Sequence, residues 1–421
     1  MAQGSQSSPR TLLWYSPLPP DPGGIALYSV CLLERLSELF EVVLVTPHQR
    51  EVLPASVRRL RAVLPSEAEA WPQHSALAVY HMGNNVAQCA WIFEALRQRP
   101  GLVVAHDLNI HGFLLDYYGR GAVRPGRLAR WRDSRWTERH PYGQALREAH
   151  GEAGAQAADA FLRHGVEPNI PALPCHRLLT RRAMAVLAHS QWAVGQLLNN
   201  GDSARAYYLP FGIEHPIPEP AGGIARFRQR LGLTAQDFLI FCGGFLEPSR
   251  RIDRVIEAQA LLAKNGLMPH LVLAGAMERI HQQWLAQLAS SRGLAGQVHF
   301  LGFLPDHNEF LAGLHAADVV LHLRLPTHGE TSATVYRALS VGRPVIVYDV
   351  DAYRELPDAC CWKLDAGPDD AELLCAYLRE LMGRQAIRLT MEESARNYVA
   401  RNHTWAHTAN AFASIVQDIC T

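Results

Sequence analysis

The segment LPTHGETSATVYRALSVGRPVIVYD carries a dense group of side chains able to bind a phosphorylated ligand. Its pattern predicts a loop, a helix, a turn and a strand, with Glu330, Thr331 and Ser332 at the start of the helix. Hydroxyls there can cap the helix, and the free N–H groups of its first turn can bind phosphate oxygens. A carboxylate would repel a phosphate, so a carboxylate next to a phosphate-binding helix start is better suited to a neutral part of the ligand. Glu330 is therefore a candidate contact to sugar hydroxyls. Simple N-terminal capping is the alternative interpretation.

A second candidate phosphate-binding segment reads GGFLEPSRRIDRVIEA. It places a glycine turn, ending at Gly244, before Arg250, Arg251 and a predicted helix. A guanidinium is permanently charged and forked, so it matches the oxygens of a diphosphate. A solvated arginine pair is the other interpretation, and the glycine turn favours phosphate.

The loop PLPPDPGGIALYS brings Gly23 and Gly24 directly before another predicted helix. Two glycines let the backbone approach a ligand closely, and the helix start offers N–H groups to an anion or a sugar hydroxyl. A tight turn, the alternative, needs one glycine rather than two. The dinucleotide-binding pattern GxGxxG does not occur in the chain.

Polar residues also follow two of the predicted strands. His106 and Asp107 follow one strand, and Asn84 and Asn85 follow another. Open parallel sheets bind ligands at the carboxyl ends of their strands. His106 and Asp107 could orient a substrate hydroxyl, or form an ion pair that caps the next helix. An asparagine both donates and accepts, so Asn84 or Asn85 could bind an acceptor's hydroxyls, although a turn fits equally well.

No metal site is expected. Asp349 and Asp351 spell DxD, a string that holds a divalent cation in some enzymes, but matches of three residues often arise by chance. The 8 cysteines lack the paired spacing of a zinc ribbon or a disulfide scaffold, so we interpret them as buried, reduced side chains. We predict that the chain needs neither a metal nor a bound cofactor.

Short apolar runs, each followed by a loop and a stretch with helical spacing, recur along the chain. This alternation is typical of a parallel sheet covered by helices. Two sets of runs predict an α/β chain with two Rossmann-like, doubly wound domains. The runs are 12–15, 42–45, 77–80, 102–105 and 185–188 in the first set, and 238–242, 271–274, 298–301, 319–323 and 345–348 in the second.

The length of 421 residues exceeds what one hydrophobic core usually serves. The stretch 212–223, GIEHPIPEPAGG, interrupts every periodicity and is expected to be a linker or hinge. We predict an N-terminal domain over 1–215, with an irregular helical insertion near 118–174, and a C-terminal domain over 216–400. A terminal helix within 401–421 is expected to pack back toward the N-terminal domain.

The charge of the chain limits the classes of partner that it can attract. The 40 Lys+Arg balance the 40 Asp+Glu, so no overall field attracts nucleic acid. Residues 1–10 are polar, and no stretch of about 18 uncharged apolar residues occurs, which favours a soluble, cytoplasmic protein. One basic stretch, 120–139, interleaves arginines with Trp131 and Trp136. It could hold an anionic or lipid-linked acceptor or touch the inner face of the membrane, whereas a solvated helical face is the commoner explanation.

Together these motifs resemble the retaining, nucleotide-sugar-dependent glycosyltransferases with the GT-B fold, a family that includes bacterial mannosyl-, glucosyl- and rhamnosyl-transferases. The similarity covers nearly the whole chain. Its most specific motifs are VHFLGFLPDHNEFLAGLHAADVVL and HGETSATVYRALSVGRPVIV, and GGIALYS, YHMGNN, PGLVVAHDLNIHGF and VLAHSQWAVGQLL add to it. The resemblance implies two Rossmann-like domains facing across a cleft, and an enzyme of polysaccharide biosynthesis.

The resemblance also implies where the donor binds. The C-terminal domain would hold the nucleotide, with the base near Phe303 and Leu304. Its diphosphate would lie on Arg250 and on the helix start at Thr331 and Ser332. The N-terminal domain would then be the acceptor side.

Further roles follow from the same resemblance. Glu330 is similar to the acidic residue that contacts the donor sugar, and Gly23, Gly24 and His106 are similar to the loop and histidine that face the reacting centre. The family retains anomeric configuration and is generally metal-free. A double displacement would need a carboxylate near the anomeric carbon, and Asp107 is the candidate.

The chain departs from the family pattern at three positions. The family usually has a second glutamate further along the helix, where Arg337 stands here. The arginine common after the phosphate-loop glycine is replaced by Phe245, and the usual lysine by Arg250. One guanidinium would then face the diphosphate from this loop, unless Arg251 substitutes for the missing one.

The predicted function is transfer of a hexose from a nucleoside-diphosphate sugar, the co-substrate, to a hydroxyl of a glycan, a lipid-linked sugar or a metabolite. Domain closure about the linker would exclude water. One alternative is a non-catalytic nucleotide-sugar-binding or partner protein, suggested by the missing second glutamate. Another is an epimerase or a phosphorylase on the same fold.

Overall fold

The computed structural model describes residues 11–72, 75–119, 134–199 and 205–420. The chain divides into two compact units. Unit 1 comprises Met1–Gly212, His328–Thr331 and Trp405–Thr421, and unit 2 comprises Ile213–Thr327 and Ser332–Thr404. The chain therefore passes between the units at 212–213 and 404–405, whereas the sequence suggested boundaries at 215–216 and 400–401. The four loop residues His328–Thr331 also belong to unit 1, although the residues on either side of them belong to unit 2.

Unit 1 is built on a parallel sheet of 7 strands in the order β3-β2-β1-β4-β5-β6-β7. The strands are β1 (Thr11–Tyr15), β2 (Glu41–Val45), β3 (Arg61–Val63), β4 (Ala76–Met82), β5 (Gly101–Ala105), β6 (Ala183–Ala188) and β7 (Arg205–Tyr208). β5 is buried along its whole length, as its continuous apolar run predicts for a strand covered on both faces.

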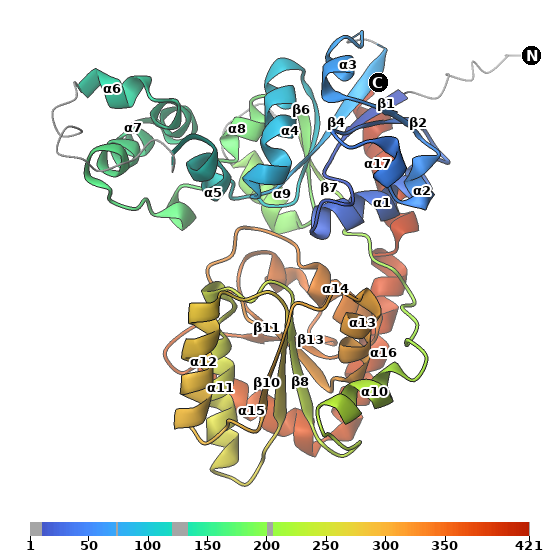
Figure 1. The fold of residues 1–421 in the computed structure, drawn as a ribbon, viewed down its shortest axis with the longest axis vertical. Helices are drawn as coiled ribbons and strands as arrows, with labels where there is room; N and C mark the ends of the chain where they lie inside the picture. Colours follow the sequence, from blue (N-terminus) through green and yellow to red (C-terminus); the bar gives the residue numbers. More distant parts are fainter. Residues whose placement is uncertain (1–10, 73–74, 120–133, 200–204, 421) are drawn as a thin grey trace, which may run out of the picture. The chain divides into compact units, whose positions relative to one another are not determined.

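The helices of unit 1 are α1 (Gly24–Leu36), α2 (Ala55–Arg58), α3 (Pro65–Glu69), α4 (Val86–Gln98), α5 (His111–Leu114), α6 (Ser134–Arg139), α7 (Pro141–His164), α8 (Arg177–Thr180), α9 (Gln191–Leu198) and α17 (Trp405–Cys420). Most of them lie against this sheet, whereas α6 and α7 stand to one side of it, beyond α5 and α8 (Figure 1). α17 packs against α1 and buries Phe412 beside Trp14, with ring centroids 5.8 Å apart. In the region of the expected insertion, the described residues form α6 and α7, and α7 is kinked at Gly151.

Unit 2 is built on a second parallel sheet, of 6 strands in the order β10-β9-β8-β11-β12-β13. The strands are β8 (Leu239–Gly243), β9 (His270–Ala274), β10 (Val298–Gly302), β11 (Val319–His322), β12 (Val345–Tyr348) and β13 (Cys361–Leu364). Its helices are α10 (Gly223–Arg230), α11 (Ile252–Ala263), α12 (Arg279–Ser291), α13 (His307–Ala316), α14 (Ala333–Ser340), α15 (Asp370–Gly383) and α16 (Gln385–Asn402). The predicted α/β class with two doubly wound sheets is confirmed.

The expected linker is held at its first residues by unit 2. The backbone N–H of Ile213 donates to His403 O at 2.7 Å, and the hydroxyl of Ser340 donates to Glu214 O at 2.6 Å. The start of this stretch is therefore anchored to the end of α14 and to the segment that precedes α17.

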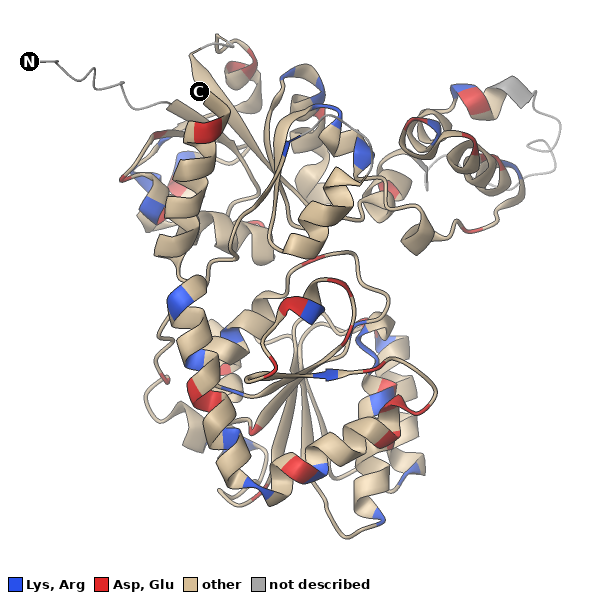
Figure 2. Cartoon of the chain, turned by 180° about the vertical axis from the view of Figure 1, so that it is seen from behind, with Lys and Arg blue, Asp and Glu red and all other residues tan. Residues whose placement is uncertain are grey.

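Figure 2 shows charges of both signs scattered over the helices and loops of each unit, while the strands are almost free of charge. This distribution agrees with the equal numbers of acidic and basic residues. Within the described ranges, no helix is long and apolar enough to cross a membrane. Residues 120–133, most of the basic stretch suggested for membrane or acceptor contact, lie outside the described residues.

One glycine of unit 2 determines how closely two loops approach. A Cβ added at Gly275 would lie 1.6 Å from the carbonyl oxygen of Gly244, so only glycine fits beside that turn. We expect Gly275→Ala to lower the free energy of unfolding by about 3 kcal/mol, because the backbone of the turn must move. Denaturant unfolding measures this loss. The matched variant Gly296→Ala, at an exposed glycine with no atom within 4 Å of the added Cβ, should stay close to the parent.

Candidate active site

The glycine turn of unit 2 lies against the start of α14. Gly244 has φ +98, and a Cβ placed there would lie 3.3 Å from Thr334 Oγ1 in the first turn of α14. The backbone N–H of Leu325 donates to Ser249 O at 2.8 Å, which joins the loop after β11 to the loop after β8. The two segments predicted to hold a diphosphate are therefore neighbours at the carboxyl edge of this sheet.

Arg250 and Ser332 are brought together by a third residue, His322 at the end of β11. Arg250 is 4% exposed, and its guanidinium donates to Gly243 O at 3.1 Å. Its Nη1 lies 3.1 Å from His322 Nε2, and Ser332 Oγ lies 3.3 Å from His322 Nδ1. Ser332 also caps α14 by accepting from Val335 N at 3.4 Å. A fixed guanidinium and a hydroxyl at a helix start form a plausible anion site.

Arg251 belongs to a different group of side chains. Its Nε and Nη2 donate to the carboxylate of Asp253, each at 3.3 Å. Arg254 and Tyr348 both contact the buried carboxylate of Asp370, at 3.2 and 2.6 Å. Arg251 is thus paired with a carboxylate on its own side of the loop, and of the two predicted arginines Arg250 is the one that shares a partner with Ser332.

Two aromatic rings are exposed after β10 and β8 of unit 2, strands that are separated in the sheet by β9. Phe303, which follows β10, is 69% exposed, and Phe245, which follows the glycine turn, is 65% exposed. Leu304 beside Phe303 is buried. An exposed ring at a strand's carboxyl end offers a flat apolar face, as a stacked base requires.

In unit 1, Gly23 and Gly24 form an exposed start to α1. Gly23 has φ +127, a value that suits glycine, and a Cβ added at Gly24 would meet nothing within 4 Å. No side chain caps the first turn of α1. That the N–H groups of this turn bind a ligand stays a prediction.

His106 lies in a cluster of buried aromatic rings and imidazoles. Its Nε2 is 2.9 Å from His81 Nδ1, and the ring of Tyr28 packs edge-on against it at 4.9 Å. His189 lies on the other side, 5.2 Å between centroids, and its Nδ1 donates to Leu209 O at 2.9 Å. Burial, followed by the two neighbouring imidazoles, holds the pKa of His106 well below its usual value. His106 is therefore a neutral hydrogen-bonding group at neutral pH.

Asp107 and the two asparagines mainly hold loops in place. The carboxylate of Asp107 accepts from Asn84 N at 2.8 Å, so His106 and Asp107 do not pair with each other. The side chain of Asn84 donates to Asn109 O and accepts from Phe113 N at 3.2 Å. Asn85 caps α4 by accepting from Gln88 N at 3.3 Å. These contacts match the turn and capping interpretation of Asn84 and Asn85 rather than that of free acceptor-binding groups.

Glu330 lies in the short loop segment, His328–Thr331, that belongs to unit 1. Its carboxylate accepts from His328 N at 2.6 Å, and His328 O accepts from Leu108 N and Asn109 N at 3.0 and 2.8 Å. Glu330 is thereby held in the same unit as His106 and Asp107. Thr331 ends this segment, whereas its neighbour Ser332 belongs to unit 2.

The fold of the whole chain has close counterparts among solved structures. Anabaena Alr3699/HepE in complex with UDP-glucose superposes with a TM-score of 0.65, at 16% identity, over 97% of this chain and 99% of that chain. Sucrose-phosphate synthase from Thermosynechococcus elongatus gives 0.63, at 16% identity, over 98% and 99%. At this level of identity the likeness shows the GT-B fold alone.

Sequence comparison gives the enzyme class. A D-inositol 3-phosphate glycosyltransferase of Salinispora arenicola is 24% identical over 417 residues, 94% of this chain and 87% of the relative. One of the same name from Thermomonospora curvata is 28% identical over 221 residues, 48% and 49% of the two chains. Residues 224–398 match the family model described as Glycosyl transferases group 1. The chain is a glycosyltransferase with the GT-B fold, and its residues 224–398 match group 1.

In this glycosyltransferase the sequence-based search missed four residues of the two clusters. In unit 2 His322 contacts Arg250, and Tyr353 contacts His322. In unit 1 His81 and His189 lie beside His106. His81, His189 and His322 lie at or just beyond the carboxyl ends of β4, β6 and β11. The rule that parallel sheets bind ligands at these ends could have identified the three histidines.

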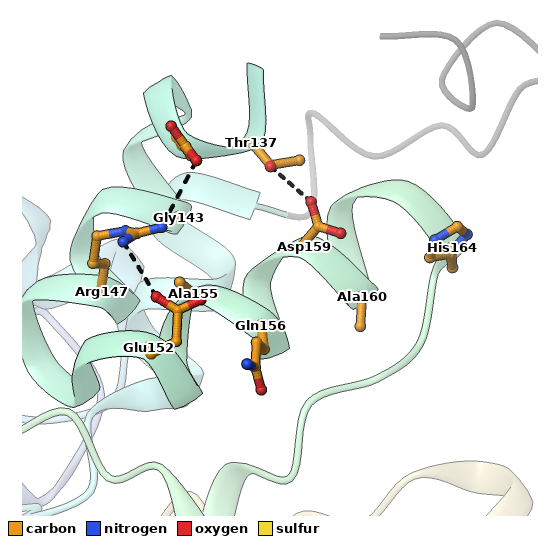
Figure 3. A pocket seen from close by; sticks show the side chains of 10 residues that line it. Thr137, Gly143, Arg147, Glu152, Ala155, Gln156, Asp159, Ala160 and His164 are labelled. Atoms are coloured by element: carbon orange, nitrogen blue, oxygen red, sulfur yellow. Dashed lines mark hydrogen bonds and ion pairs between the residues drawn. The ribbon is translucent and has the colours of Figure 1, made fainter. Parts of the chain in front are cut away.

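A pocket of about 390 Å³ lies between α6 and α7 (Figure 3). Its charged groups already pair with each other: Arg147 lies 3.4 Å from Glu152 and 4.0 Å from Glu138, and Asp159 accepts from Thr137 at 2.8 Å. It contains none of the predicted site residues. The pocket therefore gives no support for a donor site between α6 and α7.

The DxD string is engaged in local contacts. Asp351 accepts from the hydroxyl of Thr327, and Asp349 lies 3.6 Å from Arg354. Among the described residues, no group of three or more His, Cys, Asp or Glu is arranged to hold a metal ion.

Proposed function

We propose that the chain transfers a hexose from a nucleoside-diphosphate sugar to a hydroxyl acceptor with retention of anomeric configuration and without a metal. The observation that carries the proposal is the convergence of Arg250 and Ser332 on His322 beside the glycine turn. Positive charge and a helix start at one place suit the diphosphate that leaves when the sugar is transferred.

The proposed reaction breaks the bond between the anomeric carbon and the diphosphate oxygen through an oxocarbenium-like transition state. The acceptor oxygen attacks from the same face, and its proton passes to the leaving phosphate. Arg250 stabilises the negative charge that grows on that phosphate, so no protein nucleophile is needed. Asp107 is a poor nucleophile candidate, because its carboxylate accepts from the backbone of Asn84.

Unit 1 carries groups suited to a sugar's hydroxyls. Neutral His106 and the open helix start at Gly23 and Gly24 can hydrogen-bond its hydroxyls, and Glu330, fixed in the same unit, supplies a carboxylate. A neutral imidazole suits this role because it contacts a hydroxyl without placing positive charge beside an oxocarbenium-like centre. The UDP-glucose complex of the Anabaena neighbour supports a UDP-hexose as the first donor to test.

The acceptor is proposed to be a hydroxyl of a glycan, a lipid-linked sugar or a small metabolite. The names of the two sequence relatives support a phosphorylated polyol such as inositol 3-phosphate among the metabolites to test. A cytoplasmic location, with peripheral contact at the inner membrane face for a lipid-linked acceptor, completes the proposal.

The test incubates the full chain with UDP-, GDP- and ADP-hexoses, in excess EDTA, first without an acceptor and then with a panel that includes inositol 3-phosphate. We expect one donor to release free sugar slowly, and Glu330→Ala to abolish this release. With an acceptor, proton NMR of the product should show the donor's anomeric configuration. Nucleotide-sugar binding without turnover across the panel, sugar isomerisation, or phosphate-dependent turnover would contradict the proposal, as would inversion.

A further inference from the structure

The imidazole of His322 connects the two groups assigned to the diphosphate. The ring is buried, 2% exposed, at the end of β11. One nitrogen, Nε2, lies 3.1 Å from Arg250 Nη1 and 3.0 Å from the hydroxyl of Tyr353. The other nitrogen, Nδ1, lies 3.3 Å from Ser332 Oγ. Nε2 therefore faces Arg250 and Nδ1 faces Ser332, and these two residues come from different loops.

The partner on the Nε2 side decides which nitrogen carries the hydrogen. A guanidinium can only donate, so Nε2 must present its lone pair to Arg250. Burial, followed by Arg250 and Arg324, keeps the pKa of His322 well below its usual value, so the ring carries a single hydrogen. That hydrogen must reside on Nδ1, where it points to Ser332 Oγ. Tyr353, which can donate its hydroxyl hydrogen to Nε2, is compatible with the same tautomer.

This tautomer fixes the direction of the Ser332 hydroxyl. Its oxygen accepts from His322 Nδ1 and from Val335 N, and these two bonds occupy both of its lone pairs. The hydroxyl hydrogen is then left to be donated elsewhere. With the opposite tautomer, Ser332 would donate to Nδ1 and turn a lone pair toward the ligand.

We propose that His322 is a positioning residue, which orients the Ser332 hydroxyl as a hydrogen-bond donor to a phosphate oxygen of the nucleoside diphosphate. This inference rests on the proposed function. Phosphate oxygens of a diphosphate mostly accept hydrogen bonds, so a preset donor binds without reorientation, whereas a lone pair in the same place would repel the anion. Arg250 thus acts twice: it contacts the diphosphate itself, and it sets the tautomer that orients Ser332.

Two substitutions separate the functions of the two ring nitrogens. In His322→Asn the amide nitrogen can occupy the place of Nδ1 and still donate to Ser332. In His322→Gln the amide oxygen can occupy the place of Nε2 and accept from Arg250, but the donor to Ser332 is lost. We expect His322→Asn to keep the affinity for a nucleoside diphosphate within about threefold of the parent, and His322→Gln to lose about tenfold, the effect of one hydrogen bond. Calorimetry with UDP, GDP and ADP measures both.

A double-mutant cycle then tests whether His322 acts through Ser332. We expect Ser332→Ala to lower the affinity for the nucleoside diphosphate about tenfold. The double variant His322→Gln/Ser332→Ala should bind the nucleoside diphosphate no more weakly than Ser332→Ala alone. His281→Asn provides the matched control, because this ring of α12 stacks on Trp284 at 5.6 Å and should not affect binding. Equal losses in His322→Asn and His322→Gln, or additive losses in the double variant, would overturn the inference.

The tautomer can also be observed directly, which keeps the inference testable if a variant fails to fold. Long-range proton–nitrogen NMR of the unmutated chain, labelled at histidine, distinguishes an Nδ1–H from an Nε2–H ring. We expect Nδ1–H for His322, and an Nε2–H signal would refute the inference while leaving the proposed function intact. If the parent binds none of the three diphosphates, the proposed function itself fails and the role of His322 fails with it.

Discussion

The Arg250→Ala variant should transfer sugar with kcat/KM lower by about 10³-fold, the upper range for the loss of one preorganised donor to a developing negative charge. The effect is large because the guanidinium is buried and held by the carbonyl of Gly243 and by His322, so its charge acts in a medium of low dielectric. The charge on the leaving diphosphate grows in the transition state. The loss should therefore be found in kcat as well as in kcat/KM.

Steady-state kinetics with the donor that the panel identifies measures this loss, and two companion variants make the result interpretable. Arg250→Lys keeps the charge without the forked geometry, so it should lie between the parent and Arg250→Ala. Arg292→Ala removes a guanidinium whose Nη2 lies 2.8 Å from Glu257 Oε1 on α11 and should retain parental activity. A folded Arg250→Ala variant with unchanged kcat/KM would exclude Arg250 and the start of α14 as the diphosphate site.

The core of the fold could be predicted because its central strands are continuous apolar runs. All ten predicted runs correspond to strands of the two sheets. The three strands that were missed, β3, β7 and β13, lie at sheet edges. Edge strands face less of the core, so β3 (RAV) and β7 (RAYY) tolerate arginine and lose the apolar signal. Their existence depends on pairing with neighbours distant in sequence, which periodicity does not report.

The candidate donor-site residues could be chosen from side-chain chemistry, whereas their arrangement could not be predicted. Arg250 and Ser332 lie far apart in sequence, and their common partner is a histidine inside an apolar strand, where it reads as part of the core. Asn84 shows the converse. Its amide suits a sugar hydroxyl, but the backbone of Asn109 and Phe113 already engages it. The chemistry of a side chain indicates what it can bind. Only the fold decides whether its hydrogen-bonding groups are already engaged by the protein.

Stability of unit 1 should fall steeply as the pH drops from about 6.5 toward 5. Burial lowers the pKa of His189 to about 4 and holds those of His81 and His106 well below 6.5. Above 6.5 these histidines are neutral in both states, so they add no pH dependence. Below 6.5 these histidines become protonated in the unfolded chain but stay neutral in the folded chain. Each histidine then lowers the free energy of unfolding by about 1.4 kcal/mol for every pH unit. For His189 the loss continues to its folded pKa and amounts to about 3 kcal/mol.

Urea unfolding and hydrogen exchange of β4 and β5, each measured at several pH values between 7 and 5, follow this loss. Replacing His189 by glutamine should reduce the slope of unfolding free energy against pH by about 1.4 kcal/mol per unit, since one proton fewer is taken up on unfolding. Glutamine at His407, which is exposed on α17, should leave the slope unchanged. A slope that is flat over this range, or that His189→Gln does not alter, would mean that the cluster accepts protons while folded. His106 would then be charged rather than neutral, which would contradict the role proposed for it toward the sugar.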